Sequence, residues 1–114
     1  MVEQRRVVAL DPAAPPIVVT GPTITAGVSS TVAVAAATVT VLADNPARLY
    51  ACITNLGTQW VYLHLGTPAV LGEGIPLAPN GLGTYEITNE SLYTGQIDAI
   101  SNAIGSTLAV EEGT

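Results

Sequence analysis

The chain supplies few residues that could act as a catalytic nucleophile. Among its 114 residues it has one cysteine, Cys52, and one histidine, His64. Cys52 lies in an alternating apolar run, where a free thiol usually serves as a small buried side chain. No Gly-x-Ser-x-Gly turn is present to place a serine beside His64. We therefore expect no nucleophilic catalysis.

The chain also lacks the sets of residues that bind metal ions or phosphate groups. One histidine and one cysteine cannot complete a zinc site, and no Asp-x-Asn-x-Asp-Gly loop surrounds the carboxylates as a calcium site would require. The glycine pairs Gly72/Gly74 and Gly81/Gly83 lack a third glycine, and the chain has no lysine to complete a phosphate-binding loop. The sequence therefore predicts no metal and no cofactor.

Paired carboxylates could hydrolyse a glycosidic bond, with one acting as acid and the other as nucleophile or base. The candidates are Glu73, Glu86, Glu90 and Asp98. A sugar site usually also has aromatic platforms, and the chain offers one tryptophan and four tyrosines. We interpret these carboxylates as solvated strand and turn residues. A small glycoside-active enzyme is the least favoured reading, and we expect a protein that is not an enzyme.

The charge pattern argues against two classes of partner. The net charge is −6, and the only permanent cations are Arg5, Arg6 and Arg48. A nucleic-acid-binding protein needs clustered cations to displace counterions from phosphates, and attraction to an anionic membrane has the same requirement. We therefore expect no nucleic-acid partner and no membrane partner.

The elements that would position these residues are predicted to be strands. The chain is 48% hydrophobic and 11% charged, has no Phe and is rich in Val, Ile and Thr, as expected for half-buried pleated surfaces. Residues 48–54 and 60–65 alternate with period two, which is typical of strands with one face in the core. Their predicted core-facing residues are Leu49, Ala51, Ile53, Val61, Leu63 and Leu65.

Turn signals recur about every 8–12 residues, as in a sandwich or barrel. The sequence therefore predicts an all-β fold: a β-sandwich or jelly-roll-like body of seven or so short strands over residues 31–114. Within it, residues 31–43 carry alternating valines that favour a strand, although their alanines leave a short helix open.

Residues 1–30 are predicted to form an extended N-terminal arm. Pro15-Pro16 and Gly21-Pro22 break this segment into short apolar pieces that cannot form a core alone. It contains neither the longer apolar stretch of a signal peptide nor that of a membrane span. Since the arm is too apolar for a solvated linker, we expect it to lie on a neighbouring subunit or on its own body. The candidate contact residues are Arg5, Arg6, Val7, Val8, Leu10, Ile17, Val18 and Val19.

Aromatic residues supply a further candidate contact. Trp60, Tyr62 and His64 share one face of a predicted strand, and we expect Tyr50 on an adjacent strand. Two interpretations remain open, an outer layer of the core and a protein–protein patch, in which Trp and Tyr often dominate the binding energy. Trp60 and Tyr62 are therefore candidate contact residues.

Arg48 to Thr114 contains a recognisable succession of short pieces. These read Arg-Leu-Tyr-Ala-Cys-Ile-Thr-Asn-Leu-Gly, Trp-Val-Tyr-Leu-His-Leu-Gly, Gly-Ile-Pro-Leu-Ala-Pro-Asn-Gly, Tyr-Thr-Gly-Gln-Ile-Asp-Ala-Ile and Ser-Thr-Leu-Ala-Val-Glu-Glu. The succession resembles the small all-β virion proteins of tailed bacteriophages, of the capsid decoration or cement type. The arm is not covered by the resemblance, and similar patterns appear in tail, fibre and neck proteins.

The resemblance implies a non-enzymatic virion structural protein that decorates and stabilises the capsid by bridging neighbouring subunits. Its expected partners are the major capsid protein and further copies of itself in a homotrimer. Its expected location is the outer capsid surface, after synthesis in the host cytoplasm. The alternative is a carbohydrate-binding or structural β-module of a phage tail, neck or fibre.

Overall fold

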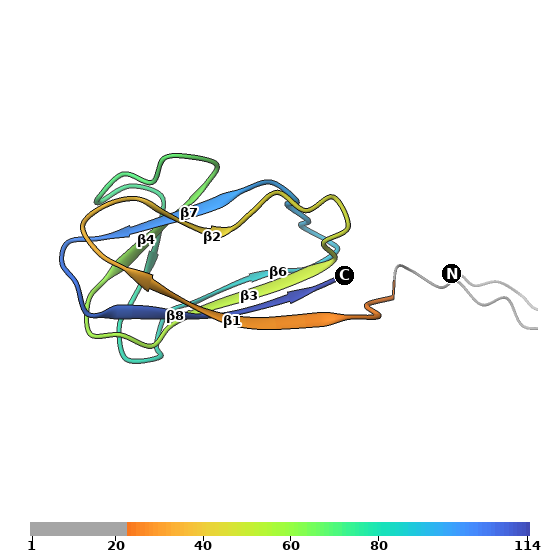
Figure 1. Ribbon diagram of the computed structural model, residues 1–114, viewed down its shortest axis with the longest axis horizontal. Coiled ribbons are helices and arrows are strands. Elements are labelled where there is room, and N and C mark those ends of the chain that lie inside the picture. Colours follow the sequence, from red (N-terminus) through yellow and green to blue (C-terminus); the bar gives the residue numbers. More distant parts are fainter. Residues whose placement is uncertain (1–22) are drawn as a thin grey trace, which may run out of the picture.

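The computed structural model describes residues 23–114. The predicted contact residues of the arm, Arg5 to Val19, lie outside the described residues. The described part forms eight strands and no helix (Figure 1). The strands are β1 (Gly27–Val34), β2 (Val39–Leu42), β3 (Tyr50–Asn55), β4 (Val61–Leu65), β5 (Ile75–Leu77), β6 (Thr84–Ile87), β7 (Ile97–Ser101) and β8 (Ser106–Gly113).

The strands build two four-stranded antiparallel sheets, with the orders β1-β8-β3-β6 and β2-β7-β4-β5. The outermost strands in sequence pair with each other, and so do the next ones inward: β1 with β8, β2 with β7, β3 with β6 and β4 with β5. Pairing of β3 with β8 and of β4 with β7 then completes each sheet. This nested order is that of a rolled hairpin, the jelly roll. The predicted all-β sandwich is confirmed.

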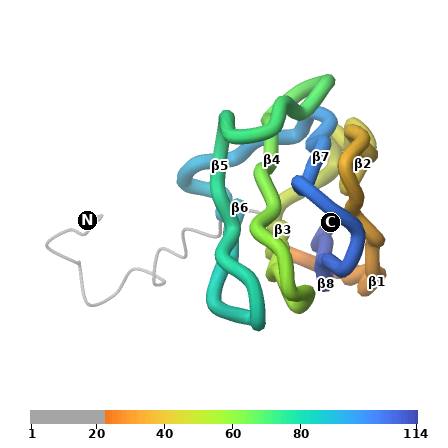
Figure 2. Tube along the Cα trace, turned by 90° about the vertical axis from the view of Figure 1, so that its left-hand side faces the viewer, coloured from red at the N-terminus to blue at the C-terminus, as the bar shows by residue number. Residues whose placement is uncertain are grey.

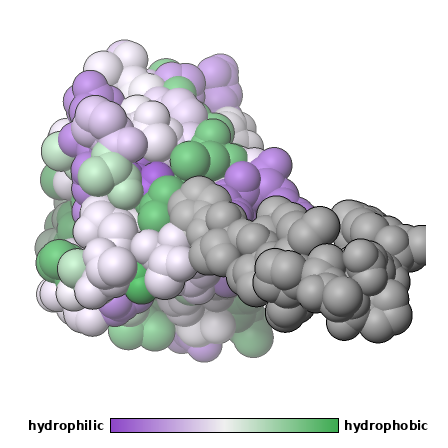
Figure 3. All heavy atoms as spheres, turned by 90° about the vertical axis from the view of Figure 1, so that its right-hand side faces the viewer, coloured by the Kyte–Doolittle hydropathy of each residue, from purple (hydrophilic) through white to green (hydrophobic). Residues whose placement is uncertain are grey.

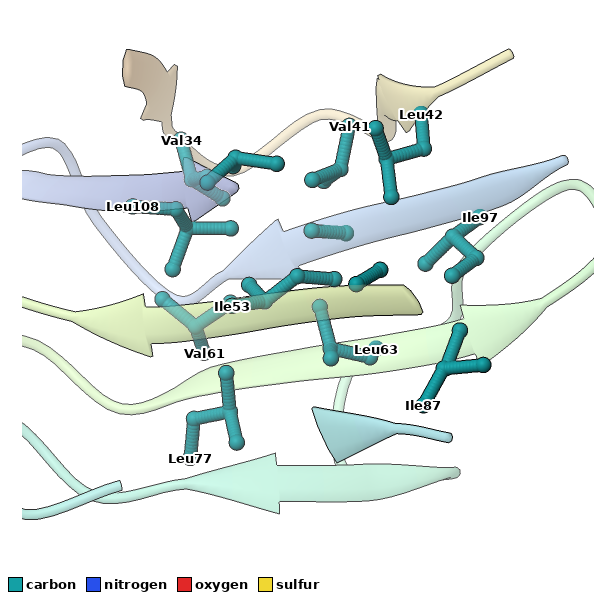
Figure 4. Packing of buried hydrophobic residues seen from close by; sticks show 13 residues of the cluster. Val34, Val41, Leu42, Ile53, Val61, Leu63, Leu77, Ile87, Ile97 and Leu108 are labelled. Carbon is teal, nitrogen blue, oxygen red and sulfur yellow. The ribbon is translucent and has the colours of Figure 1, made fainter. Parts of the chain in front are cut away.

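The core lies between the two sheets and is aliphatic (Figure 4). Ala51, Ile53, Val61 and Leu63 are fully buried, so the predicted inward faces of β3 and β4 are confirmed there. Leu49 and Leu65 depart from the prediction. Leu49 is only half-buried and precedes β3, and Leu65 is 38% exposed. It is the last residue of β4, and the chain leaves the sheet at the following glycine, whose φ is 126°.

Residues 31–43 form parts of two strands rather than one. β1 ends at Val34 and β2 begins at Val39, and the two strands belong to different sheets. The link between them is tied to β7, since Ser101 donates its backbone N–H to the carbonyl of Ala35 at 2.9 Å. The alternating valines predicted extended backbone correctly, but they carry no signal for the change of sheet. β1 begins at Gly27, so it crosses the boundary expected between residues 30 and 31.

A buried arginine closes the end of the sandwich at which the chain enters and leaves it. The side chain of Arg48 is fully buried, and its Nε forms a 2.7 Å ion pair with Glu112 on β8. Its other nitrogens donate to three backbone carbonyls, those of Ala43 (2.7 Å), Tyr93 (3.0 Å) and Gly95 (2.9 Å). One guanidinium therefore joins β8 to two loops, which suits its planar set of five donors. From its sequence context Arg48 was expected only to contribute a positive charge.

Candidate protein-contact surface

Three turns meet at the end of the sandwich opposite Thr114. They are the β3–β4 turn (residues 56–60), the β5–β6 turn (78–83) and the β7–β8 turn (102–105), and together we call them the turn face. Backbone hydrogen bonds connect them: Asn80 donates to Gly57 (2.8 Å) and Thr58 donates to Gly105 (3.1 Å). Figure 2 views the molecule from this end. The turn face is therefore one continuous surface.

The buried side chain of Asn55 fixes the turn face from inside the body. Its side chain is fully buried, and its Nδ2 donates to the carbonyls of Gln59 (2.7 Å) and Leu77 (3.0 Å), while its Oδ1 accepts the N–H of Gly57 (3.0 Å). Ser106 adds two bonds to the backbone of Gln59. A Cβ on Gly57 would collide with the Cα of Ser106, so this close packing requires glycine. These bonds fix the conformation of the turns.

The exposed side chains of the turn face are uncharged: the large ones are apolar, and the polar ones are Thr58, Asn80 and Asn102. Leu82 is 80% exposed, Ile104 79%, Leu56 55% and Trp60 49%. Residues 56–60, 78–83 and 102–105 contain no charged side chain. Depletion of charge together with exposed aromatic and aliphatic side chains is typical of the centre of a protein–protein interface.

The opposite end of the body differs in character. Its loops carry Asp44 and Glu90, both of them exposed. Figure 3 views this end and shows hydrophilic residues, in purple, interspersed with hydrophobic ones, in green. The two ends of the body therefore offer different surfaces to a partner, and only the turn face is free of charge.

The structure places the predicted aromatic residues in three separate environments. Trp60 lies on the turn face, and Tyr62 is half-buried on β4, where it pairs with Pro76 on β5 and Ile100 on β7. Tyr50 is not on an adjacent strand, and that prediction is wrong. Although β3 and β4 follow one another in sequence, they belong to different sheets.

Tyr50 instead belongs to the outer face of the β1-β8-β3-β6 sheet. Its hydroxyl donates to the carboxylate of Glu86 at 2.8 Å. This hydrogen bond, more than partial desolvation and the neighbouring Cys52, raises the pKa of Tyr50 well above its ordinary value. The phenol thus stays protonated and acts as a hydrogen-bond donor to β6.

The same outer face carries a shallow groove of about 570 Å³ beside Cys52. The residues that line it are Ser29, Ser30, Thr31, Cys52, Thr54, Ala109, Val110 and Glu111. The hydroxyl of Ser29 donates to Glu111 across it. A sugar-binding groove lined by Trp60 and the tyrosines was the expectation for a carbohydrate-binding module, and this groove contains none of them.

Asp98 on β7 is a buried carboxylate, only 2% exposed. Its Oδ1 accepts a hydrogen bond from Gln96 (2.8 Å), and its Oδ2 accepts one from Thr38 (3.3 Å). Burial alone would raise its pKa, but hydrogen bonds from Gln96 and neighbouring threonines outweigh burial, so the pKa lies below its ordinary value. Thr38 in turn accepts the N–H of Ala69 at 3.0 Å. The carboxylate therefore ties β7 to the β1–β2 link and to the β4–β5 loop.

Within residues 23–114, no group of three or more His, Cys, Asp or Glu side chains lies close enough together to hold a metal ion. The same part of the chain contains no helix long and apolar enough to cross a membrane.

Comparison with known proteins gives no match: no family model, curated protein or solved structure is similar to the chain at a significant level.

Proposed function

We propose that the chain is a non-enzymatic structural protein of a phage virion. It sits on the outside of the capsid and bridges neighbouring subunits of the major capsid protein. The observation that carries this proposal is the turn face, a rigid and uncharged surface with four exposed apolar side chains, Leu56, Trp60, Leu82 and Ile104. A decoration protein needs such a surface because its work is done by binding alone.

The resemblance to decoration proteins adds support, because its short pieces contact one another inside the body. Arg48, which opens the first piece, binds the carbonyls of Tyr93 and Gly95 in the fourth and the carboxylate of Glu112 in the last. Asn55, which lies near the end of the first piece, binds the carbonyl of Leu77 in the third. The pattern of pieces therefore corresponds to the residues that hold this sandwich together.

Bound copies would stabilise the capsid by mass action, because a ligand of the closed shell opposes its opening. Burial of each large apolar side chain of the turn face contributes about 1.5–3 kcal/mol before ordering costs. The arm adds a second contact in this proposal. The described chain enters β1 at the end of the body opposite the turn face, so the arm would contact a neighbouring copy in a homotrimer from that end.

The test is binding to capsids that lack this protein, measured by co-sedimentation. The double variant Leu82→Asp with Ile104→Asp places two carboxylates on the turn face, where both positions are about 80% exposed, so folding is retained. The matched control is Leu71→Asp, on the β4–β5 loop outside the turn face, where the side chain is 49% exposed.

The proposal predicts that the double variant binds at least 100-fold more weakly, which corresponds to about 3 kcal/mol, and that the control binds like the unmodified protein. Unchanged binding of the double variant would exclude the turn face as the capsid contact. Binding to glycans on an array, with no binding to capsids, would instead favour a carbohydrate-binding module of a tail, neck or fibre.

A further inference from the structure

Within the part of the chain that the structure describes, the first strand leaves one edge of its sheet open. β1 is eight residues long and, within residues 23–114, pairs only with β8. It is the outermost strand of its sheet, and Figure 2 shows it at one margin of the molecule. Its sequence, Gly-Val-Ser-Ser-Thr-Val-Ala-Val, has no charge and no proline. Long, uncharged edge strands of this kind readily pair with another strand, and proteins usually block them with charge, proline or a covering segment.

The ladder with β8 determines which backbone groups of β1 are free. Ala26 and Thr114 exchange both of their backbone hydrogen bonds, at 3.1 and 2.9 Å. Because such pairs alternate along an antiparallel ladder, Val28, Ser30, Val32 and Val34 also bond to β8. The N–H and C=O groups of the alternate residues therefore point to the open edge. These residues are Gly27, Ser29, Thr31 and Ala33.

A second copy of the same strand fits this set of groups. An antiparallel pair with a twofold axis at Ser30 brings Gly27 opposite Ala33 and Ser29 opposite Thr31 of the other copy, and vice versa. All four residues with free groups then lie in hydrogen-bonded pairs. A shift of this axis by one residue in either direction leaves at least one of them without a partner, so the centred register is selected.

The side chains are self-complementary in the same register. On one face, Val28 lies opposite Val32 of the other copy, and Ser30 lies opposite Ser30. On the other face, the hydroxyls of Ser29 and Thr31 meet. Val28 is 63% exposed in the single chain, and this pairing gives it an apolar neighbour. Matched β-branched and hydroxyl pairs stabilise antiparallel strands, whereas like charges directly opposite would destabilise them.

We propose that β1 pairs with β1 of a second copy around a twofold axis at Ser30, which joins two four-stranded sheets into one of eight strands. Such an isologous contact requires an even number of chains. The number is two, or six where two of the expected trimers join through this edge. The pairing needs no capsid, so its test in solution is separate from the test of the proposed function.

The register is tested by disulfide formation in the full-length chain with Cys52→Ser as background. In the proposed pair, Ser30 faces itself at a non-hydrogen-bonded position, where Cα atoms are about 4.5 Å apart, within the range that a disulfide spans. Ser30→Cys should therefore form a covalent dimer under mild oxidation. Val28→Cys is the matched control, because its two copies would lie about 13 Å apart along the strands, too far for a disulfide.

Sedimentation provides the independent measurement. The unmodified chain should have the mass of two or six copies, and Ser30→Lys should raise the dissociation constant at least tenfold by placing like charges face to face. Ser91→Lys, on the exposed β6–β7 loop, adds the same charge away from the edge and should leave association unchanged. A monomer or a simple trimer, no disulfide with Ser30→Cys, or equal crosslinking of Val28→Cys would each overturn the proposal.

Discussion

Replacement of Arg48 by methionine should destabilise the body more than any conservative surface change. The variant keeps a long apolar side chain but removes the ion pair with Glu112, whose side chain is only 17% exposed. It also removes the hydrogen bonds to the carbonyls of Ala43, Tyr93 and Gly95. Removal of one partner from a buried ion pair typically costs about 3–5 kcal/mol, because the other charge is left without compensation.

The assay is thermal and urea unfolding followed by circular dichroism. A domain of this size loses about 4–8 °C in Tm per kcal/mol, so Arg48→Met should lower Tm by roughly 12–40 °C. The Tm of Arg48→Lys should lie between the Tm of the unmodified protein and that of Arg48→Met. An ammonium group keeps the positive charge but cannot reach the carbonyls in the same geometry. Glu112→Gln added to Arg48→Met should recover part of the loss, because it removes the uncompensated carboxylate.

A fall in Tm of less than about 4 °C for Arg48→Met, or no recovery in the double variant, would refute the assignment of Arg48 as the residue that joins β8 to the two loops.

Two further predictions concern a buried carboxylate and the arm. Asp98→Asn should cost about 1–3 kcal/mol of the free energy of unfolding, since an amide cannot accept all the hydrogen bonds that the carboxylate receives. Because the pKa of Asp98 is lowered in the folded protein, its contribution is present above its ordinary pKa near 3.8 and is lost as the pH falls through the folded value. Urea unfolding of both proteins between pH 7 and about pH 2 should therefore show the difference shrinking with acid, and a difference that grows would contradict the argument. Deletion of residues 1–22 should leave the Tm of the body unchanged and weaken attachment to capsids, whereas unchanged co-sedimentation would remove the arm from the proposed contact.

The strands could be predicted from the sequence because burial on one face imposes a period of two. Ile53 and Leu63 show this, since both were predicted to face the core and both are fully buried. The two-residue period of apolar residues does not determine which sheet a strand joins. For that reason Tyr50 was wrongly expected on a strand adjacent to that of Trp60. Sheet membership depends on pairing between distant strands, such as β1 with β8.

The polar residues inside the body could not be predicted in the same way. Arg48 reads as a surface charge in the sequence, and its burial depends on Glu112, which lies 64 residues further along the chain. The turn face was missed for a similar reason. Leu56, Leu82 and Ile104 are isolated apolar residues in three turns, and only the folded sandwich brings these turns together. The Asn80-Gly81 pair is the available signal for one of them, since asparagine tolerates a positive φ, and Asn80 has a φ of 64°.

The proposal that this chain decorates a phage capsid is tested most directly by cryo-electron microscopy of virions that contain the chain. The account predicts an eight-stranded sandwich on the outside of the head, with Leu56, Trp60, Leu82 and Ile104 against the major capsid protein at a joint between subunits. Density for the sandwich in the tail, neck or fibre, or on the head with the turn face directed into solvent, would contradict it.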